Sequence, residues 1–512
     1  MKTVIGKLFI RLHSYLEKYP VQIFFSLMIL SIADRVNTLL RFSFQYIDSD
    51  QTVLWNVTKD MANGRWYAPC FYGQAYNPNI EALLAAPLVK TGIDVYIALP
   101  IVTSVLTLTP FFILAFFLKK KSGPLAGCWP LLVLLCMPSE YGMLTGMPRG
   151  FVTGVFFAVP ALCLILINKR RWDFTASILL GIAFYANPNS VLLLPLAIPY
   201  VLEAGSFKKR IPAFLAGGIL GLIPLALNAW FYKQHPGYIV HPSPAGSFSV
   251  EAFGHIIANL ESYLKPVSPI TGWLMLVFMI LITVQLKKSG HKNYFTGAIF
   301  MFMLLFISFF SDKVADGRDS IYFSGGRMLL VFPFIALFFT LWTLKSMNKI
   351  QVNFLFICIV LTATLKLGFK FAFIGSDAAY EQKSTDYTVV GISTVDALRS
   401  ECKLLKEFGN PDLIVSSSPN SHDQLVVYGC GCLVENFPPT LLSSYERRKW
   451  QRDPVMDKVY KNVLIFGNEK AANDSIDRSQ VSILKEDSLK HWILMENNRS
   501  TKELLKVMNI KN

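Results

Sequence analysis

The chain has 512 residues, of which 53% are hydrophobic and only 16% are charged, and its formal net charge is +15. This composition excludes a disordered chain, a coiled coil and a single water-soluble domain. It also speaks against a nucleic-acid partner, because the sequence shows no basic stripe with interleaved aromatic residues. A high apolar content with an excess of cations is typical of a polytopic membrane protein whose cytoplasmic loops carry Lys and Arg.

The charge is divided unevenly along the chain. Residues 375–512 hold 18 Lys and Arg against 19 Asp and Glu, whereas residues 1–374 hold 31 and 15. The sequence therefore predicts a polytopic α-helical membrane domain at 1–374 and a soluble extracytoplasmic α/β domain at 375–512.

Apolar runs of about the length that crosses a bilayer recur through the first part of the chain. We expect about eleven transmembrane helices, with ten to twelve as the range, because several runs are short. The runs are 20–40, 93–118, 124–138, 151–167, 174–187, 190–204, 211–232, 269–286, 294–311, 328–345 and 351–374.

The loops between the runs predict the orientation. With a cytoplasmic N-terminus, 18 of the 31 basic residues fall on the cytoplasmic side, and every cytoplasmic hairpin has a basic cluster such as Lys119–Lys121. Most acidic residues then lie in the outer loops, and an odd number of spans places the C-terminal domain outside. We expect an integral multi-pass protein of a bacterial inner membrane whose chemistry is on the outer face.

The C-terminal domain alternates between strand and helix patterns, which is typical of a small α/β layer domain. Strands are predicted at Thr388–Ser393, Asp412–Ser416, Leu425–Tyr428 and Val463–Phe466, and helices at Val395–Phe408, Pro439–Tyr460 and Thr501–Met508.

Eight Cys residues are present, and four of them lie in polar segments: Cys70, Cys402, Cys430 and Cys432. Their spacing fits no usual zinc site. A disulfide that involves one of these four is open if their side of the membrane is oxidising.

The first outer loop, residues 41–92, carries the most chemical information. Asp48 and Asp50 follow the first span directly, and residues 51–62 predict an amphipathic helix on the membrane surface with Val53, Leu54, Val57 and Met61 toward lipid. Gly64 is expected to end this helix. A second short helix is predicted at 79–90, and it contains Glu81.

The order of these features resembles the first outer loop of the GT-C fold glycosyltransferases, and most closely the aminoarabinose-transferase and protein O-mannosyltransferase group. The matching segments are Asp50-Gln51, Gly64-Arg65-Trp66, Pro69, Gly73 and Asn77–Glu81. Two further segments, Phe184–Pro195 and Gly326–Pro333, also resemble the group. The resemblance implies sugar transfer from a polyprenyl-phosphate-linked donor to a lipid, glycan or protein acceptor on the outer face.

Such a transfer needs a base for the acceptor hydroxyl and cations for the leaving phosphate. We expect Asp50 to be the base, Asp48 to be a second carboxylate or a metal ligand, and Glu81 to be a third acid. Arg327 and Arg149 are the candidate phosphate-binding residues, since Arg binds phosphate bidentately. A divalent cation, Mg²⁺ or Mn²⁺, held by Asp48 and Asp50 is left open.

Each assignment has an alternative. Asp48 and Asp50 are also suited to capping the surface helix, Glu81 to a solvated helix face, and Arg327 to an interfacial anchor. Asp34-Arg35 is interpreted as an interfacial ion pair. For the whole chain, the alternatives are a transporter or flippase, against which the scarcity of charges in the spans argues, and a non-catalytic membrane scaffold.

Overall fold

The computed structural model describes residues 14–203, 207–241, 248–315, 329–345, 347–373, 393–417, 421–442, 449–467 and 482–507. The chain forms two compact units, and each is assembled from segments that lie far apart in the sequence. The first unit comprises Met1–Phe42, Thr103–Leu225 and Pro244–Tyr387. The second unit comprises Ser43–Val102, Ala226–Ser243 and Thr388–Asn512.

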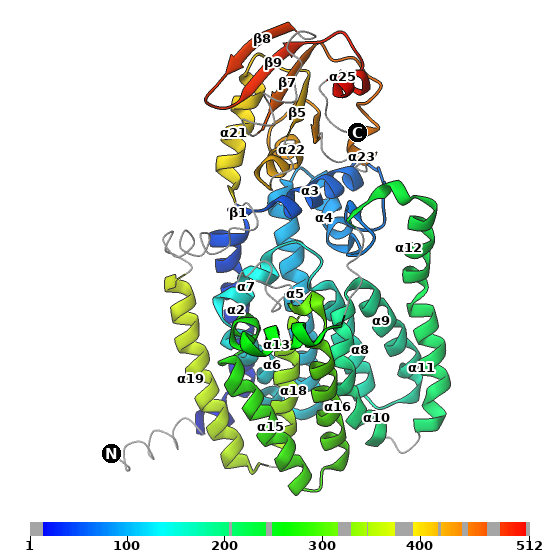
Figure 1. Ribbon diagram of the computed structural model, residues 1–512. Helices are drawn as coiled ribbons and strands as arrows, with labels where there is room; N and C mark the ends of the chain where they lie inside the picture. The colour runs from blue at the N-terminus through cyan, green and yellow to red at the C-terminus, as the bar shows by residue number, and fades with distance from the viewer. Residues whose placement is uncertain are drawn as a thin grey trace. The chain divides into compact units, whose positions relative to one another are not determined.

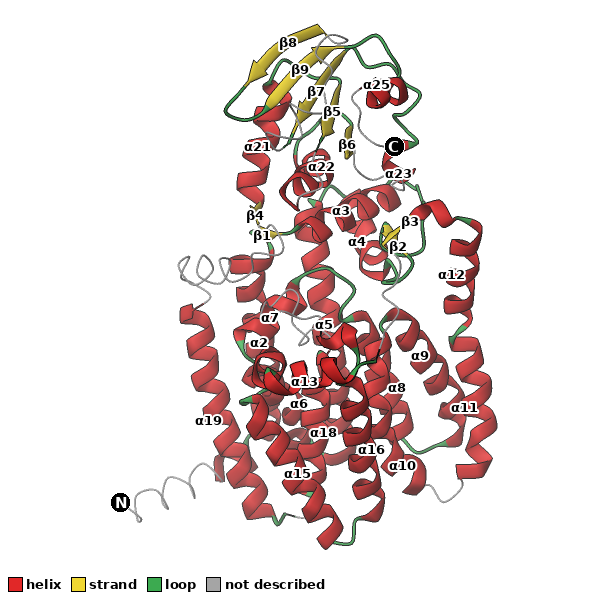
Figure 2. Ribbon diagram, in the orientation of Figure 1, coloured by secondary structure: helices red, strands yellow, loops and turns green. Residues whose placement is uncertain are grey.

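The first unit is built from helices, many of them apolar (Figures 1 and 2). Two of its helices, α5 and α12, continue into the second unit. The helices are α2 (Pro20–Thr38), α5 (Val95–Ser122), α6 (Pro124–Cys136), α7 (Ser139–Gly146), α8 (Thr153–Leu166), α9 (Asp173–Ala186), α10 (Ile198–Glu203), α11 (Phe207–Gly221), α12 (Ile223–Gln234), α13 (Val250–Ala258), α14 (Leu260–Leu264), α15 (Gly272–Lys288), α16 (Lys292–Ser308), α17 (Asp312–Ala315), α18 (Phe332–Leu344) and α19 (Lys349–Phe373).

Helix is found in each of the apolar runs of the sequence, but the helices differ in length. Four segments of the described chain are long and apolar enough to cross a bilayer: Pro20–Ser43, Val95–Ser122, Lys208–Gln234 and Lys349–Ala372. A fifth is added if Leu260–Val267 and Gly272–Lys288, bent by 82°, count as one span. The helical class is therefore confirmed, whereas the number of spans stays a prediction.

Burial within the first unit separates its inner helices from its outer ones. All residues of α18 from Phe332 to Thr340 are buried, as expected for a helix that is apolar on every side. Outer helices instead expose large apolar side chains, among them Ile29 of α2, Ile219 of α11 and Phe369 of α19. Exposed apolar surface on this scale is suited to lipid rather than to water.

The second unit contains a five-stranded sheet with the strand order β6-β5-β7-β9-β8 (Figure 2). Strand β5 is parallel to β6 and to β7, whereas β9 is antiparallel to β7 and to β8. The strands are β5 (Leu413–Ser416), β6 (Thr440–Leu442), β7 (Asn462–Phe466), β8 (Ser482–Asp487) and β9 (Trp492–Glu496). The accompanying helices are α21 (Val395–Glu407), α22 (Ser421–Leu433), α23 (Lys449–Arg452) and α25 (Thr501–Val507).

The expected α/β pattern is largely found in the described residues, with two corrections, and the strand predicted at Thr388–Ser393 lies outside these residues except for Ser393. The strand prediction for Leu425–Tyr428 is wrong, because these residues lie inside α22. All four are buried, so the helix is enclosed on several sides and packing overrides the strand preference of the two Val residues. The helix prediction for Pro439–Tyr460 is also wrong, since its described residues contain the strand β6 and, as helix, only the short α23.

Part of the first outer loop belongs to the same unit. Its elements are β1 (Tyr46–Ile47), α3 (Ser49–Ala62), β2 (Gly73–Gln74) and α4 (Ile80–Lys90). Strand β1 pairs with β4 (Ser393–Thr394), and β2 pairs with β3 (Ile239–His241). Three segments that are remote in the sequence are thus joined by backbone pairing.

Candidate functional site

Helix α3 places the two acidic residues of the first loop at its N-terminus. Asp48 is the N-cap, and its Oδ1 accepts a hydrogen bond at 2.9 Å from the backbone N–H of Gln51. Asp50 follows in the first turn and is partly exposed, whereas Asp48 is 0% exposed. Both carboxylates lie at the end of the helix dipole that favours negative charge. The structure therefore shows that Asp48 caps α3, as the alternative interpretation expected. Of the two acids, Asp50 is the one that is accessible to solvent.

The environment of α3 corrects its predicted orientation. The expected lipid-facing residues Val53, Leu54 and Val57 are buried within the protein. Helix α4 packs on α3, and so does α22. These contacts enclose most of the apolar face of α3 within the protein, whereas Met61 near its end is only partly buried.

Two side-chain contacts hold α3 against α22. Asn56 Nδ2 donates to the carbonyl oxygen of Tyr428 at 2.6 Å, and Lys59 Nζ donates to that of Gly431 at 2.8 Å. Gly429 permits this approach, because a Cβ there would meet the Thr52 side chain at 3.2 Å and Leu398 at 2.6 Å. The α/β part of the unit thus fixes the helix that carries Asp48 and Asp50.

Glu81 lies in the first turn of α4 and is only 2% exposed. The alternative of a solvated helix face for this acid is therefore excluded. Since α4 packs against α3, the second unit carries all three predicted acids on two neighbouring helices. Gly64 ends the helical region after α3 in the left-handed conformation, with φ +74°, as predicted.

The last turn of α3 contains an acid that the sequence did not single out. Asp60 lies 3.0 Å from Arg65 and accepts a hydrogen bond from Tyr72 Oη at 3.1 Å. Burial raises the pKa of Asp60 above its ordinary value, in spite of the nearby Arg65. Burial and Asp60 also raise the pKa of Tyr72, which keeps its hydroxyl protonated as a donor. No spacing in the sequence predicts that Asp60, Arg65 and Tyr72 meet, because their contacts depend on the geometry of the turn after α3.

The two predicted phosphate-binding residues are placed differently. Arg149 lies in the first unit, in the turn between α7 and α8, and is buried. Arg327 lies outside the described residues.

Within the part of the chain that the structure describes, no group of three or more His, Cys, Asp and Glu residues is arranged to hold a metal ion. A metal at Asp48 and Asp50 stays a prediction.

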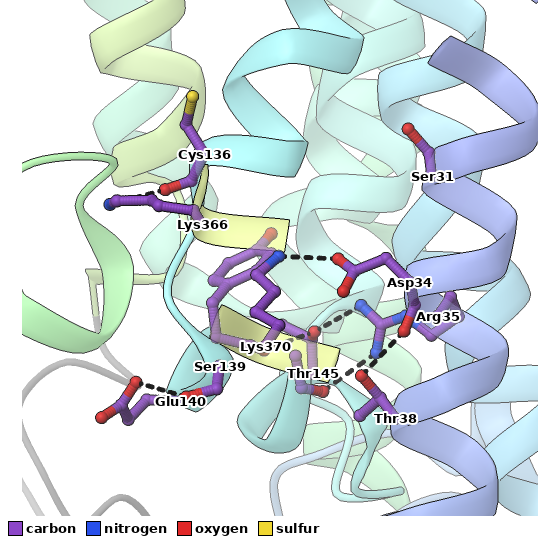
Figure 3. Close-up of polar contacts among 12 residues, drawn as sticks. Ser31, Asp34, Arg35, Thr38, Cys136, Ser139, Glu140, Thr145, Lys366 and Lys370 are labelled. Atoms are coloured by element: carbon purple, nitrogen blue, oxygen red, sulfur yellow. Dashed lines mark hydrogen bonds and ion pairs between the residues drawn. The ribbon is translucent and has the colours of Figure 1, made fainter. Parts of the chain in front are cut away.

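A polar cluster in the first unit was missed by sequence reasoning (Figure 3). Lys370 Nζ of α19 lies 2.6 Å from Asp34 Oδ2 of α2, so Asp34 pairs with Lys370 and not with the adjacent Arg35. Arg35 instead donates to the Gly142 carbonyl at 3.0 Å and to Thr145 Oγ1 at 2.8 Å. The available signal was a pair of lysines, Lys366 and Lys370, four residues apart in an apolar run, where ionisable residues are costly.

Comparison with known proteins rests on the fold, because no family model matches the sequence and no curated relative matches it. The crystal structure of ArnT from Cupriavidus metallidurans bound to undecaprenyl phosphate is similar, with a TM-score of 0.59 and 10% identity, over 91% of this chain and 97% of that chain. The apo state of the same protein is similar with a TM-score of 0.57 and 10% identity over the same shares.

The chain has the GT-C fold of ArnT. This finding confirms the fold that the resemblance of the first outer loop predicted. At 10% identity the similarity establishes the fold alone, which is that of an integral membrane protein with several apolar helices. Because nearly the whole length of ArnT is matched, the fold includes both the helical unit and the unit that holds Asp48, Asp50 and Glu81.

Proposed function

We propose that the chain is a membrane glycosyltransferase that transfers a sugar from a polyprenyl-phosphate-linked donor to a lipid, glycan or protein acceptor on the outer face of a bacterial inner membrane. The observation that carries this proposal is the match to ArnT over 91% of the chain, together with the bound undecaprenyl phosphate in one ArnT structure. Asp48, Asp50 and Glu81, which lie in one unit of this chain, provide the carboxylates that the proposed transfer needs.

Asp50 acts as the general base in this proposal. Its carboxylate takes the proton of the acceptor hydroxyl, and the freed oxygen attacks the anomeric carbon of the donor sugar. The bond between that carbon and the phosphate oxygen breaks, and the polyprenyl phosphate leaves with the electron pair. Partial exposure supports Asp50 in this role, since the acceptor must reach the base.

In this proposal Asp48 and Glu81 assist Asp50, the general base. Asp48 is buried and bonded to the backbone of Gln51, so it fixes the first turn of α3 and thereby the position of Asp50. Glu81 supplies a further buried carboxylate on the adjacent helix. Arg149 and Arg327 are proposed to hold the leaving phosphate, whose charge increases as the sugar departs.

The disulfide of the second unit supports an extracytoplasmic position for it. Cys402 and Cys430 are bonded to each other and join α21 to α22. Disulfides persist in the periplasm and outside the cell, and are rare in the cytosol. In intact cells, Lys403→Cys on the exposed face of α21 is expected to react with a membrane-impermeant maleimide. Labelling only after lysis would contradict the proposed topology.

A transfer assay tests the catalytic proposal. The purified chain is incubated with a set of polyprenyl-phosphate sugars and cell-envelope acceptors, and product is followed by mass spectrometry. Asp50→Asn is expected to lower turnover by about 100-fold or more with unchanged folding. Asp396→Asn on α21, the same change at an exposed acid, is the matched control and is expected to leave turnover unchanged.

The transporter alternative is favoured by one observation, the ion pair of Asp34 and Lys370 between two spans. The cavity beside this pair has a volume of only about 10 Å³, which is enough for about one water molecule. Transport of a labelled substrate into vesicles that persists in Asp50→Asn and stops in Lys370→Met would support a carrier. A chain that shows neither transfer nor transport, with no effect of Asp48→Asn or Asp50→Asn in cells, would instead support the scaffold.

A further inference from the structure

A groove opens on the second unit along α4 and the turn that follows α3. Its volume is about 390 Å³, within the range of about 300–1,000 Å³ that is common for ligand pockets. Its apolar lining includes Met61, Trp66, Leu83 and Pro87, and the cations Arg65 and Lys90 also line it. The groove lies wholly within residues 61–90 and contains none of the predicted catalytic acids.

The side chains of α4 point to an apolar neighbour outside the protein. Ala82, Ala85 and Ala86 are buried, whereas Leu83 and Leu84 are 50% and 46% exposed. In a water-soluble helix the large apolar side chains face the interior. Trp66, beside Leu83 in the groove lining, is 56% exposed as well. This inverted pattern is expected of a helix whose outer face lies against lipid.

The connection between α4 and α5 keeps the groove close to the start of a helix that is long and apolar enough to cross a bilayer. Helix α4 ends at Lys90, and α5, one of the four segments able to cross a bilayer, begins at Val95. The four residues between them span at most about 14 Å. With α5 crossing the bilayer, the end of α4 stays within this distance of the start of that helix, and Trp is enriched at membrane–water interfaces.

The two cations complete a site for an anionic headgroup. The Arg65 side chain is 58% exposed and contacts Asp60 at 3.0 Å, and a guanidinium has five N–H donors, which is enough for a second anion. Lys90 is exposed in the last turn of α4. Basic residues at this depth attract the phosphates of anionic lipids.

We propose that the groove binds an anionic phospholipid of the surrounding bilayer. Its phosphate lies between Arg65 and Lys90, and the upper part of one acyl chain lies along Trp66, Leu83 and Pro87. This inference does not rest on the glycosyltransferase proposal, because it follows from the exposure pattern, the tether to α5 and the charges of the groove.

Photocrosslinking from inside the groove tests the proposal. The full chain with p-benzoylphenylalanine in place of Leu83 is reconstituted in bilayers of phosphatidylglycerol and phosphatidylcholine with the same acyl chains, one of them radiolabelled. Phosphatidylglycerol is expected to crosslink in preference to phosphatidylcholine. Arg65→Gln and Lys90→Gln are each expected to lower this preference about 5-fold, the effect of one basic residue near a membrane surface.

The double variant Lys403→Gln with Lys502→Gln, on exposed residues of α21 and α25, is the matched control and should leave the preference unchanged. Leu84, also exposed on α4, is the second crosslinking position in case the label at 83 disturbs folding. Equal labelling by both lipids, no labelling, or a preference that survives Arg65→Gln with Lys90→Gln overturns the proposal. Displacement by stoichiometric polyprenyl phosphate also overturns it, because the groove then belongs to the donor lipid.

Discussion

Lys370 Nζ of α19 and Asp34 Oδ2 of α2 lie 2.6 Å apart, and the two residues are 336 positions apart in the sequence. Their side chains are only 7% and 13% exposed. The pair therefore links α2 to α19, the first and last of the long apolar helices among the described residues. Since it is buried among apolar helices, each charge depends on the other for compensation.

Removing one partner of this pair is expected to cost more than removing both. Lys370→Met or Asp34→Leu leaves a buried charge and should lower the free energy of unfolding by about 3–5 kcal/mol. The double variant should recover most of this loss. Thermal unfolding of the full chain in detergent measures the effect. Lys349→Gln, which breaks the exposed pair with Glu17, is the control and should cost less than about 1 kcal/mol.

The capping role of Asp48 predicts different results for two substitutions. Asp48→Ala removes the acceptor for the Gln51 N–H and should cost about 1 kcal/mol of stability. Asp48→Asn keeps a good cap and should cost only a fraction of this. Denaturant unfolding of the full chain compares them. An equal loss in both variants would show that the charge of Asp48, and not its cap, stabilises α3.

Close packing of α9 and α11 predicts a strong effect of a single methyl group. A Cβ at Gly221 would lie 2.4 Å from the Ile178 carbonyl oxygen, and one at Gly217 would lie 2.3 Å from that of Phe174. Small residues permit such contacts between membrane helices. Gly221→Ala should cost about 1–3 kcal/mol through overpacking. Gly368→Ala on α19, where no atom lies within 4 Å of the added Cβ, should cost nothing, and a matching loss there would contradict the explanation.

The disulfide predicts a redox dependence of stability. Cys402 and Cys430 enclose a loop with a sequence separation of 28, and loss of a bond of this kind costs about 2–4 kcal/mol. Thermal unfolding with and without reductant should show this shift in the wild type, but not in Cys402→Ser with Cys430→Ser. Cys432→Ser is the control, because Cys432 is a free cysteine outside this disulfide, and desolvation raises the pKa of its thiol above the ordinary value.

His422 predicts a small pH dependence. Its ring nitrogen lies 3.0 Å from Glu401, and this hydrogen bond raises the pKa of His422 above its ordinary value of 6.5. Stabilisation by the pair is therefore complete below pH 6.5 and is lost as the pH rises through the raised pKa. The side chain is 57% exposed, so we expect less than about 1 kcal/mol. His422→Gln should remove this part of the pH profile of the melting temperature, and an unchanged profile would exclude the pair as its source.

Local patterns in the sequence predicted most of the elements around the candidate site. The helix at α3, its end at Gly64 and the helix at α4 follow from nearby residues, because caps, glycines and apolar periodicity act over one or two turns. The strand predicted at Leu425–Tyr428 was wrong because its neighbours come from remote segments. Packing of α22 against α3 and α21 overrides local strand preference there.

Composition and local order were enough to predict a polytopic helical protein, an α/β region after the last span and the resemblance to GT-C enzymes. These features depend on the lengths of apolar runs and on short motifs, and both can be recognised within a short stretch of consecutive residues. The pairing of Asp34 with Lys370, the burial of Glu81 and the enclosure of α3 by α22 depend on contacts across tens to hundreds of residues. Many such pairings are compatible with one sequence pattern, and the packing of the whole chain selects among them.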